Sequence, residues 1–453
     1  RRRLSARRLR PMSRPALPAG PYLVVGLVRS GIAAALALRA RGEEVFGTDA
    51  AGLAPEALAG SGVVLLDHDL AALENVACIV KSPGVPATVP LIATARERGL
   101  AVIGEVELAW RLLPNDFVAV TGTNGKTTTV ELLGAIYEAA GRSVAVAGNV
   151  GRALSLLAVP APLGAGPLEP TATVVCEASS FQLEDTEAFA PRAAVLLNIA
   201  PDHLDRHGDM AAYTAAKLRI FANQKGDDVA VVPAGARLDV GGNARRVTFG
   251  RADDADMHAD EDWLWWRGER LIELSQIRLR GPHNAENAMA AAAAALECGL
   301  PAAAVRDALA TFAGVAHRLE EVATRDGVLF VNDSKGTNVA STLVALRAFD
   351  PGSVHLILGG RGKGEDFSAL ADVVAHAARA VYLIGETAEE IGAALQSSGV
   401  ELEQCGTLER ALAAAARAAR AGEVVLLSPA CTSFDQFADY EQRGEAFRRL
   451  AQA

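Results

Sequence analysis

Residues 117–129 run from an apolar segment through a glycine loop into a predicted helix, and the loop ends in a lysine followed by threonines. Gly122 and Gly125 would let the backbone curl so that successive N–H groups point inward, and the start of the helix adds positive partial charge. Lys126 would then reach the outer phosphates of a nucleotide, and the Thr127 hydroxyl would reach a magnesium ion. The segment predicts a triphosphate site, although a tight strand-to-helix turn would use the same glycines.

The spacing of this loop departs from G-x-x-x-x-G-K followed by Ser or Thr. Val120 stands where the first glycine should be, and Gly122 comes two residues later. The segment is therefore a short variant of the phosphate loop.

Two further polar segments follow apolar runs that we predict to be strands. Glu177 comes directly after residues 173–176 and could hold Mg²⁺ near the phosphate loop, although Ser and Glu are also ordinary residues at a helix start. The second run covers residues 193–197. His203 and His207 follow it and are four residues apart. Without an H-E-x-x-H pattern or an evident third ligand, this spacing does not indicate zinc.

Three more segments have open interpretations. Lys217 lies on a predicted amphipathic helix, where a lysine ordinarily faces solvent. Asn284 and Asn287 begin an alanine-rich helix and could present two carboxamides to an adenine, or they could form an ordinary N-cap. Residues 332–338 join a strand to a helix with more polar groups than capping requires, and loops of this kind commonly carry functional sites.

The composition describes a globular protein of several domains. A chain of 453 residues predicts about three domains, and 50% hydrophobic with 22% charged residues is typical of soluble proteins. No apolar run is long enough to span a bilayer. The five cysteines are scattered singly, which favours a reducing compartment and argues against a thiolate metal site. We therefore expect a cytoplasmic protein without membrane insertion.

The charge distribution limits the possible partners. The formal net charge is −10, but seven of the 44 basic residues are arginines within the first fourteen positions, and the remainder has 37 basic against 54 acidic residues. This excess of acidic residues in the rest of the chain argues against general binding to nucleic acid or to an anionic membrane. The arginine-rich start could be a transit peptide or a nucleic-acid arm. We expect a disordered extension over residues 1–20.

Strand and helix patterns alternate along the rest of the chain, which predicts an α/β fold with three domains. A Rossmann-like domain is predicted over residues 21–109, a P-loop domain over 110–316, and a second Rossmann-like domain over 317–453. The loop from Gly26 to Gly31 lacks the middle glycine of G-x-G-x-x-G, so it is a weak dinucleotide fingerprint.

Taken together, these segments resemble the ATP-dependent Mur ligase family over nearly the whole chain beyond residue 20. The family's own form of the phosphate loop is Thr-Gly-Thr-Asn-Gly-Lys-Thr, which explains the unusual spacing at residues 121–127. The other matching segments follow in the family's order: Gly148-Asn149-Val-Gly151, residues 177–184, Asp202-His203-Leu-Asp205-Arg206 and Asn332-Asp333-Ser334-Lys335. Residues 428–437 and 441–444 look like the D-glutamate-adding member of the family.

The resemblance implies a set of site residues. The catalytic residues would be Lys126, Glu177, His203 and Lys217, and two Mg²⁺ ions would be held by Thr127, Glu177, His203 and Lys217, the last as a carbamate. ATP would be bound by Gly122, Thr123, Asn124, Gly125, Lys126, Thr127, Thr128, Asn284, Asn287, Arg318 and Asp333. The UDP-linked substrate would be bound by Ser30, Gly31, Asp49, Ser82, Asn149 and Lys335. D-Glutamate would be bound by Thr337, Lys363, Ser433, Phe434 and Tyr440.

The reaction that the resemblance implies joins D-glutamate to UDP-N-acetylmuramoyl-L-alanine with ATP as co-substrate, in the synthesis of a peptidoglycan precursor. It implies that the first domain binds the UDP moiety, the central one is the ATPase and the last closes over the site. The substrate carboxylate would first become an acyl phosphate. We expect a monomer that acts on small molecules.

Three other hypotheses remain open at this point. A related ligase could add another amino acid or extend folate, although the N-terminal domain and residues 428–433 argue against both. An NAD-dependent dehydrogenase could use the Gly26 loop, but the phosphate loop would then have no purpose. A non-catalytic nucleotide-binding regulator would not need Lys126, Glu177 and Lys217 to be intact.

Overall fold

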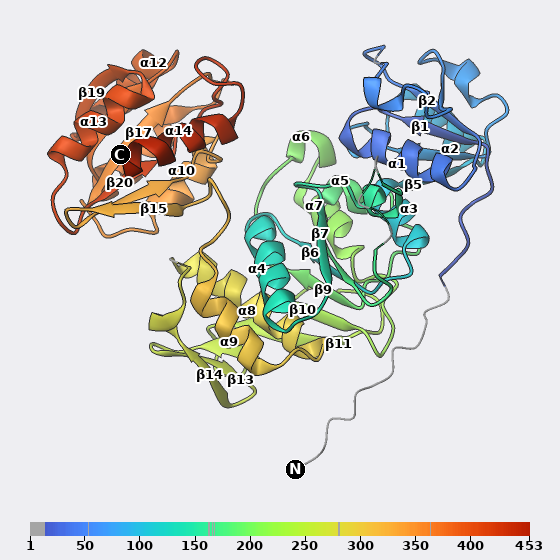
Figure 1. The fold of residues 1–453 in the computed structure, drawn as a ribbon, viewed down its shortest axis with the longest axis horizontal. Coiled ribbons are helices and arrows are strands. Elements are labelled where there is room, and N and C mark those ends of the chain that lie inside the picture. Colours follow the sequence, from blue (N-terminus) through green and yellow to red (C-terminus); the bar gives the residue numbers. More distant parts are fainter. Residues whose placement is uncertain are drawn as a thin grey trace. The chain divides into compact units, whose positions relative to one another are not determined.

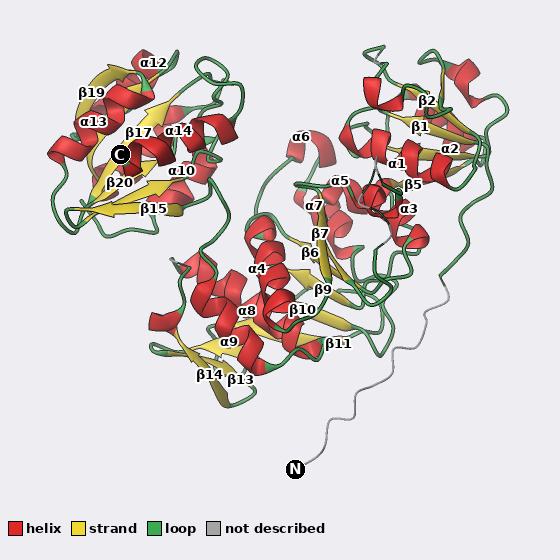
Figure 2. Cartoon of the chain, viewed as in Figure 1, coloured by secondary structure: helices red, strands yellow, loops and turns green. Residues whose placement is uncertain are grey.

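The computed structural model describes residues 14–453 except 53, 162, 163, 165, 167, 280 and 363. The described chain forms two compact units. The first contains the residues up to Gln276 together with Glu286–Ala310, and the second contains Ile277–Ala285 together with Thr311–Ala453. Figures 1 and 2 show three β-sheets covered by helices, two of them in the first unit and one in the second. The α/β class predicted from the sequence is therefore confirmed.

The N-terminal sheet has the order β3-β2-β1-β4-β5 within the described chain, and all of its pairings are parallel. Its strands are β1 (Tyr22–Val25), β2 (Val45–Thr48), β3 (Val64–Leu65), β4 (Cys78–Lys81) and β5 (Ala101–Gly104). Its helices are α1 (Arg29–Ala40), α2 (Pro90–Glu97) and α3 (Glu105–Leu112). Tyr22 and Val24 face a core that includes α1, whereas Leu23 and Val25 face α2. Both faces are covered, which explains why β1 is apolar throughout rather than alternating.

The central sheet has the order β14-β13-β12-β11-β10-β9-β6-β8-β7 among the described residues. It is parallel from β7 to β12 and ends in an antiparallel meander. The strands are β6 (Phe117–Thr121), β7 (Val144–Gly148), β8 (Thr173–Glu177), β9 (Ala193–Leu196), β10 (Val229–Pro233), β11 (Arg245–Gly250), β12 (Met257–Ala259), β13 (Trp263–Trp266) and β14 (Glu269–Glu273). The helices are α4 (Lys126–Ala139), α5 (Ser180–Leu183), α6 (Leu204–His207), α7 (Met210–Leu218), α8 (Pro282–Glu297) and α9 (Ala302–Thr311).

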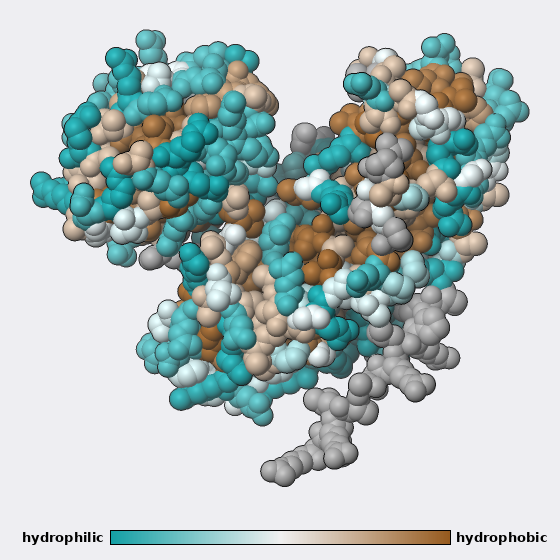
Figure 3. Space-filling model, in the orientation of Figure 1, coloured by the Kyte–Doolittle hydropathy of each residue, from teal (hydrophilic) through white to brown (hydrophobic). Residues whose placement is uncertain are grey.

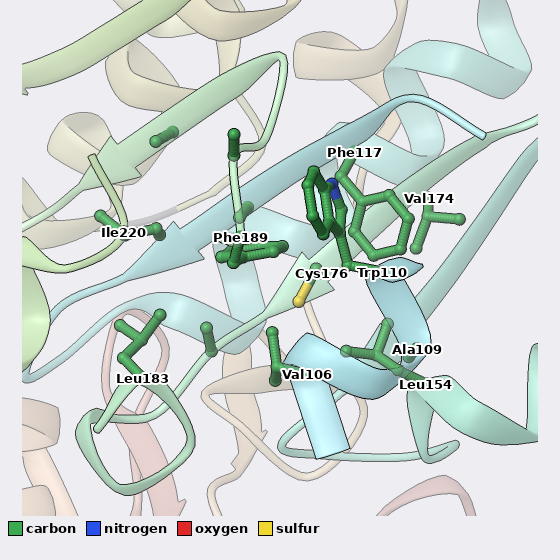
Figure 4. Packing of buried hydrophobic residues seen from close by; sticks show 14 of the residues in the cluster. Val106, Ala109, Trp110, Phe117, Leu154, Val174, Cys176, Leu183, Phe189 and Ile220 are labelled. Carbon is green, nitrogen blue, oxygen red and sulfur yellow. The ribbon is translucent and has the colours of Figure 1, made fainter. Parts of the chain in front are cut away.

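An aromatic cluster under this sheet connects it to α3 (Figure 4). The ring of Phe189 meets both Trp110 and Phe117 edge-on, with centroids 6.1 Å apart in each pair. Edge-to-face packing of this kind adds to the burial of apolar area. Because Trp110 comes from α3, that helix packs into the core of the central sheet as well as bordering the N-terminal one.

The sheet of the second unit has the order β15-β16-β20-β17-β18-β19 in the described residues, and only β15 is antiparallel to its neighbour. The strands are β15 (Glu320–Arg325), β16 (Val328–Asn332), β17 (Val354–Gly359), β18 (Ala378–Ile384), β19 (Glu401–Gly406) and β20 (Val424–Leu427). The helices are α10 (Val339–Leu346), α11 (Ala371–Ala377), α12 (Ala388–Ala394), α13 (Leu408–Ala418) and α14 (Tyr440–Gln452). Leu356 and Leu358 face one core cluster and Ile357 faces the other, so helices cover both faces of this sheet too.

The strand predicted over residues 173–176 is part of β8, and the alanine-rich helix predicted at Asn284 and Asn287 is α8. Trp263–Trp266 and Glu269–Glu273 form an antiparallel hairpin at the end of the central sheet. Part of the predicted N-terminal extension, residues 1–13, lies outside the described residues. Within the described part, Arg14 donates hydrogen bonds to the carbonyls of Trp110 and Asn115 and lies 4.8 Å from the Trp110 ring centroid.

The surface of the second unit is mostly hydrophilic on the face seen in Figure 3. Among the described residues, the exposed large hydrophobic side chains include Val64, Leu65 and Leu70 of the N-terminal sheet region and Phe434 of the second unit. None of the described helices combines the length and the hydropathy that a membrane span requires.

We predict that Phe189→Ala lowers the free energy of unfolding of the first unit by about 3–5 kcal/mol, because it removes a buried ring and leaves a cavity. Urea titration followed by tryptophan fluorescence measures this, since Trp110 contacts the missing ring. Leu70→Ala is the control, because Leu70 is 43% exposed and its truncation should shift the midpoint little. Equal shifts for the two variants would contradict the assignment of Phe189 to the core.

Candidate active site

The carboxyl ends of three neighbouring strands meet in the middle of the central sheet. β6 pairs with β8 on one side and β9 on the other, and all three run parallel. The chain continues outward from β6 in both directions, so this is the switch point at which open parallel sheets bind ligands. The phosphate loop follows β6, Glu177 ends β8, and residues 198–203 follow β9. The structure therefore brings together three segments that the sequence predicted separately.

The phosphate loop is shaped by two glycines with positive φ. Gly122 has φ +155° and Gly125 has φ +84°, and a Cβ on Gly125 would lie 2.1 Å from Asn287 Oδ1. No other residue fits at position 125 without moving the carboxamide. Asn198 holds the loop from the opposite side, since its Oδ1 accepts from the Asn124 N–H at 2.9 Å and its Nδ2 donates to the Asn124 carbonyl at 3.2 Å.

Two lysine ammonium groups converge on one carbonyl of this loop. Lys126 Nζ donates to the carbonyl oxygens of Gly122 at 2.9 Å and Thr123 at 2.8 Å, and Lys217 Nζ donates to that of Gly122 at 2.8 Å. Lys217 is buried and lies over the Tyr213 ring, 4.5 Å from its centroid. Burial, together with the charge of Lys126, lowers the pKa of Lys217 to about 7. The lysine that the helix pattern alone would place in solvent is thus an internal group of the site.

Glu177 presents an incompletely satisfied carboxylate at the end of β8. Its Oε1 accepts from Asn149 Nδ2 at 3.0 Å, whereas Oε2 is buried with no hydrogen-bond partner among the described residues. A buried oxygen of this kind is costly unless it binds something. Thr127 and Thr128 are also buried, on the first turn of α4. The carboxylate and the Thr127 hydroxyl have the oxygen chemistry that Mg²⁺ prefers.

The two histidines of the predicted metal-site loop have different surroundings. His203 adopts the left-handed conformation with φ +52°, and its side chain is 49% exposed, beside Asp202 and the Phe181 ring. His207 is more enclosed, stacked on Phe181 and hydrogen-bonded to Ser180 Oγ at 3.0 Å, and burial lowers its pKa. No group of three or more His, Cys, Asp or Glu side chains suited to a metal ion occurs in the part of the chain described here.

The predicted residues of the N-terminal sheet gather at its carboxyl edge. Ser82 Oγ donates to the Gly26 carbonyl at 2.7 Å, and a Cβ on Gly31 would lie 1.8 Å from that same oxygen. Asp49 Oδ2 accepts from the Leu27 N–H at 2.7 Å. Ser30 lies on the first turn of α1. This edge is the switch point between β1 and β4, where an open parallel sheet binds ligands.

In the second unit, Asp333 is buried and its carboxylate is hydrogen-bonded. Its Oδ2 accepts from Ser428 Oγ at 2.7 Å and its Oδ1 from the Leu319 N–H at 3.2 Å, and burial raises its pKa to about 6. Arg318 acts on this carboxylate as a positive charge. Lys335 Nζ lies 5.5 Å from the centroid of the Tyr440 ring.

The remaining predicted residues of this unit have varied environments. Ser433 is buried, whereas Phe434 is 60% exposed. Thr337 begins the turn into α10, where its N–H donates to the Lys335 carbonyl at 2.8 Å. Asn284 lies buried on the first turn of α8. Lys363 lies outside the described residues.

Sequence reasoning missed several residues that hold these sites. Asn198 was detectable, because it follows an apolar strand at a sheet edge just as Glu177 does. Tyr213 was not, since its contacts with Thr123 Oγ1, 3.1 Å away, and with Lys217 depend on the packing of α7. Arg443 is almost completely buried and donates to Ser334 Oγ at 3.0 Å, although nothing in its local sequence predicts an internal arginine.

The comparisons with known proteins agree with this geometry. The Mur ligase middle domain matches residues 120–295, and the glutamate ligase domain of Mur ligases matches residues 317–431. The chain therefore belongs to the Mur ligase family, as its motifs predicted.

Two similar proteins carry a more specific name. Proteins named UDP-N-acetylmuramoylalanine--D-glutamate ligase from Acidobacterium capsulatum and Anaeromyxobacter dehalogenans are 45% and 44% identical to this chain, covering 95% and 97% of it and 96% and 99% of their own lengths. A solved UDP-N-acetylmuramate-alanine ligase from Thermotoga maritima has a similar fold, with a TM-score of 0.61 at 21% identity over 96% of this chain and 99% of its own.

We predict that Lys217 reacts with acetic anhydride half-maximally near pH 7 in bicarbonate-free buffer, because its folded-state pKa is about 7 rather than 10.5 and the nucleophilic neutral amine forms above it. Lys126→Ala should move this midpoint upward, since it removes a neighbouring positive charge. Mass spectrometry of the labelled peptides at a series of pH values measures both effects, with the exposed Lys225 as internal reference. A Lys217 midpoint near 10.5 would contradict the buried amine.

Proposed function

We propose that this protein joins D-glutamate to UDP-N-acetylmuramoyl-L-alanine at the expense of ATP, in peptidoglycan precursor synthesis. The observation that carries this proposal is the 45% identity, over 95% of the chain, to a protein named for that reaction. The phosphate loop, Glu177 and Lys217 meet at one sheet edge, which supports a catalytic rather than a regulatory role.

We assign the three ligands to three domains. The UDP-linked substrate belongs to residues 21–109, ATP to residues 110–316 and D-glutamate to residues 317–453. The three separate sheets support this division, with α3 shared between the first two cores. The UDP-linked substrate would bind at Ser30, Gly31, Asp49 and Ser82, with further contacts from Asn149 and Lys335. ATP would bind at residues 122–128, with Asn284, Asn287, Arg318 and Asp333. D-Glutamate would bind at Thr337, Lys363, Ser433, Phe434 and Tyr440.

The proposed reaction has two steps. The substrate carboxylate attacks the γ-phosphorus of ATP and ADP leaves, which gives an acyl phosphate. The amine of D-glutamate then attacks the acyl carbon, the tetrahedral intermediate expels phosphate, and the amine proton goes to solvent. No protein nucleophile is required, so catalysis rests on alignment and on the stabilisation of negative charge. Lys126 and the N–H groups of the first turn of α4 would supply positive charge to the phosphates.

The oxygen donors at the end of β8 fit a bound Mg²⁺. The buried, unpartnered Oε2 of Glu177 and the hydroxyl of Thr127 would hold it, together with His203. Mg²⁺ would supply charge neutralisation on the phosphates. The pKa of Lys217, about 7, leaves much of its amine neutral at physiological pH, and this form combines with CO₂ to give a carbamate and a proton. The carbamate would convert a repelling cation into an oxygen ligand.

Phosphate release is the direct test of the proposed activity. With ATP, Mg²⁺ and UDP-N-acetylmuramoyl-L-alanine, we expect release that depends on D-glutamate and a product heavier by one glutamyl residue. L-Glutamate, lysine, meso-diaminopimelate and no amino acid are the comparisons. Phosphate release only with another amino acid would indicate a Mur ligase with a different amino-acid substrate. No phosphate release with any of these amino acids would favour a non-catalytic regulator.

We predict that Asn149→Ala weakens Mg²⁺ activation by about 10–100-fold, because it removes the amide that orients Glu177 Oε1. The Mg²⁺ dependence of phosphate release measures this. Asn223→Ala is the matched control, since the Asn223 amide donates only to the carbonyls of Glu187 and Phe189 in the described contacts. If Asn149→Ala raises the KM for the UDP-linked substrate and leaves the Mg²⁺ dependence unchanged, Asn149 is a substrate contact instead.

A further inference from the structure

Arg206 connects the loop after β9 to the N-terminal sheet. It lies on α6 with a side chain that is 18% exposed, and its Nη2 donates to the Val85 carbonyl at 3.0 Å. The guanidinium also lies 5.0 Å from the centroid of the Phe181 ring and 3.6 Å from Glu184 Oε2. A single side chain thus contacts the turn after β4, helix α5 and the acidic end of α5, all within the first unit.

The Phe181 ring contacts Arg206 and both histidines of the same turn. Its centroid is 4.8 Å from the His203 ring and 5.3 Å from the His207 ring, and the latter pair is stacked at 12°. His207 is also held by Ser180 Oγ at 3.0 Å and by Glu184 Oε1 at 3.2 Å, and Glu184 is the carboxylate that Arg206 contacts. His203 has fewer partners of its own, so its ring depends more on the Phe181 contact than His207 does.

The turn that Arg206 holds also lines the Gly26 loop. The Val85 N–H donates to the Ser82 carbonyl at 3.0 Å, which closes the turn, and Ser82 Oγ donates to the Gly26 carbonyl at 2.7 Å. A Cβ on Gly26 would lie 2.8 Å from Val85 Cγ2 and 2.9 Å from Ser82 Cβ. The turn is packed against the loop, and its Val85 carbonyl also accepts from Lys81 Nζ at 2.8 Å. A displacement of the Gly26 loop would therefore act on the Val85 carbonyl and on both cations that donate to it.

We propose that Arg206 is a positioning residue that couples occupancy of the Gly26–Gly31 loop to the placement of His203 beside the phosphate loop. This inference rests on the proposed function, because it takes the ligand of the Gly26 loop to be the UDP-linked substrate. The path is a continuous set of contacts from Gly26 through Ser82 and Val85 to Arg206, Phe181 and His203. Coupling of this kind is reciprocal, so each ligand raises the affinity for the other by the same factor.

The coupling factor is the ratio of the two affinities for the ATP analogue, measured with and without the UDP-linked substrate. If Arg206 were merely structural, replacing it would leave this factor unchanged. Calorimetry gives the affinity for a non-hydrolysable ATP analogue with Mg²⁺, in the absence and in the presence of saturating UDP-N-acetylmuramoyl-L-alanine. We expect the full-length protein to show at least about fivefold coupling and Arg206→Ala to reduce it to about 1, with each affinity measured alone unchanged. Arg206→Lys should give an intermediate factor, because it keeps the charge but loses the planar group over Phe181.

Two further variants keep the test decisive. Phe181→Leu keeps the hydrogen bond from Arg206 to the Val85 carbonyl but removes the aromatic ring, so it should also reduce the coupling factor. This variant provides the test if Arg206→Ala does not fold. Arg96→Ala is the control, because Arg96 bridges the same two sheets through Asp185 without touching Phe181, and its coupling should match the unchanged protein.

The proposal is overturned if the unchanged protein shows no coupling, or if the folded Arg206→Ala or Phe181→Leu variant retains it in full. Equal loss in Arg96→Ala would indicate general loosening of the junction and would also overturn it. Failure of the proposed function is a separate outcome, seen as absence of D-glutamate-dependent phosphate release from the unchanged protein.

Discussion

The carbonyl oxygen of Gly122 accepts hydrogen bonds from two lysines, and the central site depends on this arrangement. The ammonium groups of Lys126 and Lys217 would repel one another if both were charged and dry, since like charges raise the energy at close range. The depressed pKa of Lys217 relieves the repulsion by releasing a proton. The same arrangement brings the amine of Lys217 to the phosphate loop beside Lys126.

The sheets of the first unit are joined by buried charges rather than by apolar contact alone. Lys81 Nζ lies 2.8 Å from Asp185 Oδ2, and both side chains are almost completely buried. Glu107, on α3, accepts from the N–H groups of Glu187 and Phe189, both at 2.9 Å, and from Ala188 at 3.1 Å. Such ions are stable only when fully paired, so they fix one geometry more than they add stability. A fixed junction is what the Arg206 contacts require in order to transmit a displacement.

The second unit stores backbone strain around Asp333. His317, Leu319 and Ala430 all have positive φ, at +61°, +45° and +57°, although none is glycine. Each one is tied to the loop that carries Asp333: the His317 carbonyl accepts from the Lys335 N–H, the Leu319 N–H donates to Asp333, and the Ala430 N–H donates to the Gly336 carbonyl. Conformations of this type cost about 1–3 kcal/mol each and cluster at functional sites. The strain supports a binding role for a loop that its polar density had already marked.

Local chemistry in the sequence determined the phosphate loop, the parallel strands and the polar residues at their carboxyl ends. These features can be recognised from residues that are close together in the chain. They are the glycines with positive φ, the continuous apolar runs of strands covered on both faces, and the lysine at the start of a helix. The residues after β6 and β8 could therefore be predicted to meet, and the sequence alone placed Glu177 and Lys126 at the carboxyl ends of these strands.

Only the tertiary structure decided which distant side chains complete the site. The pattern of α7 gives Lys217 a solvent-facing place, but packing of the helix against α5 and the phosphate loop buries it on the Gly122 carbonyl. The hairpin of β13 and β14 is hard to predict, because its tryptophans lie half-buried on the strand next to the edge strand and lack a clear alternation. The spacing of four residues between His203 and His207 does not indicate which of them is buried. The side chain of His203 is half-exposed, whereas that of His207 is enclosed. Burial and partners come from contacts far apart in the chain, which local periodicity does not encode.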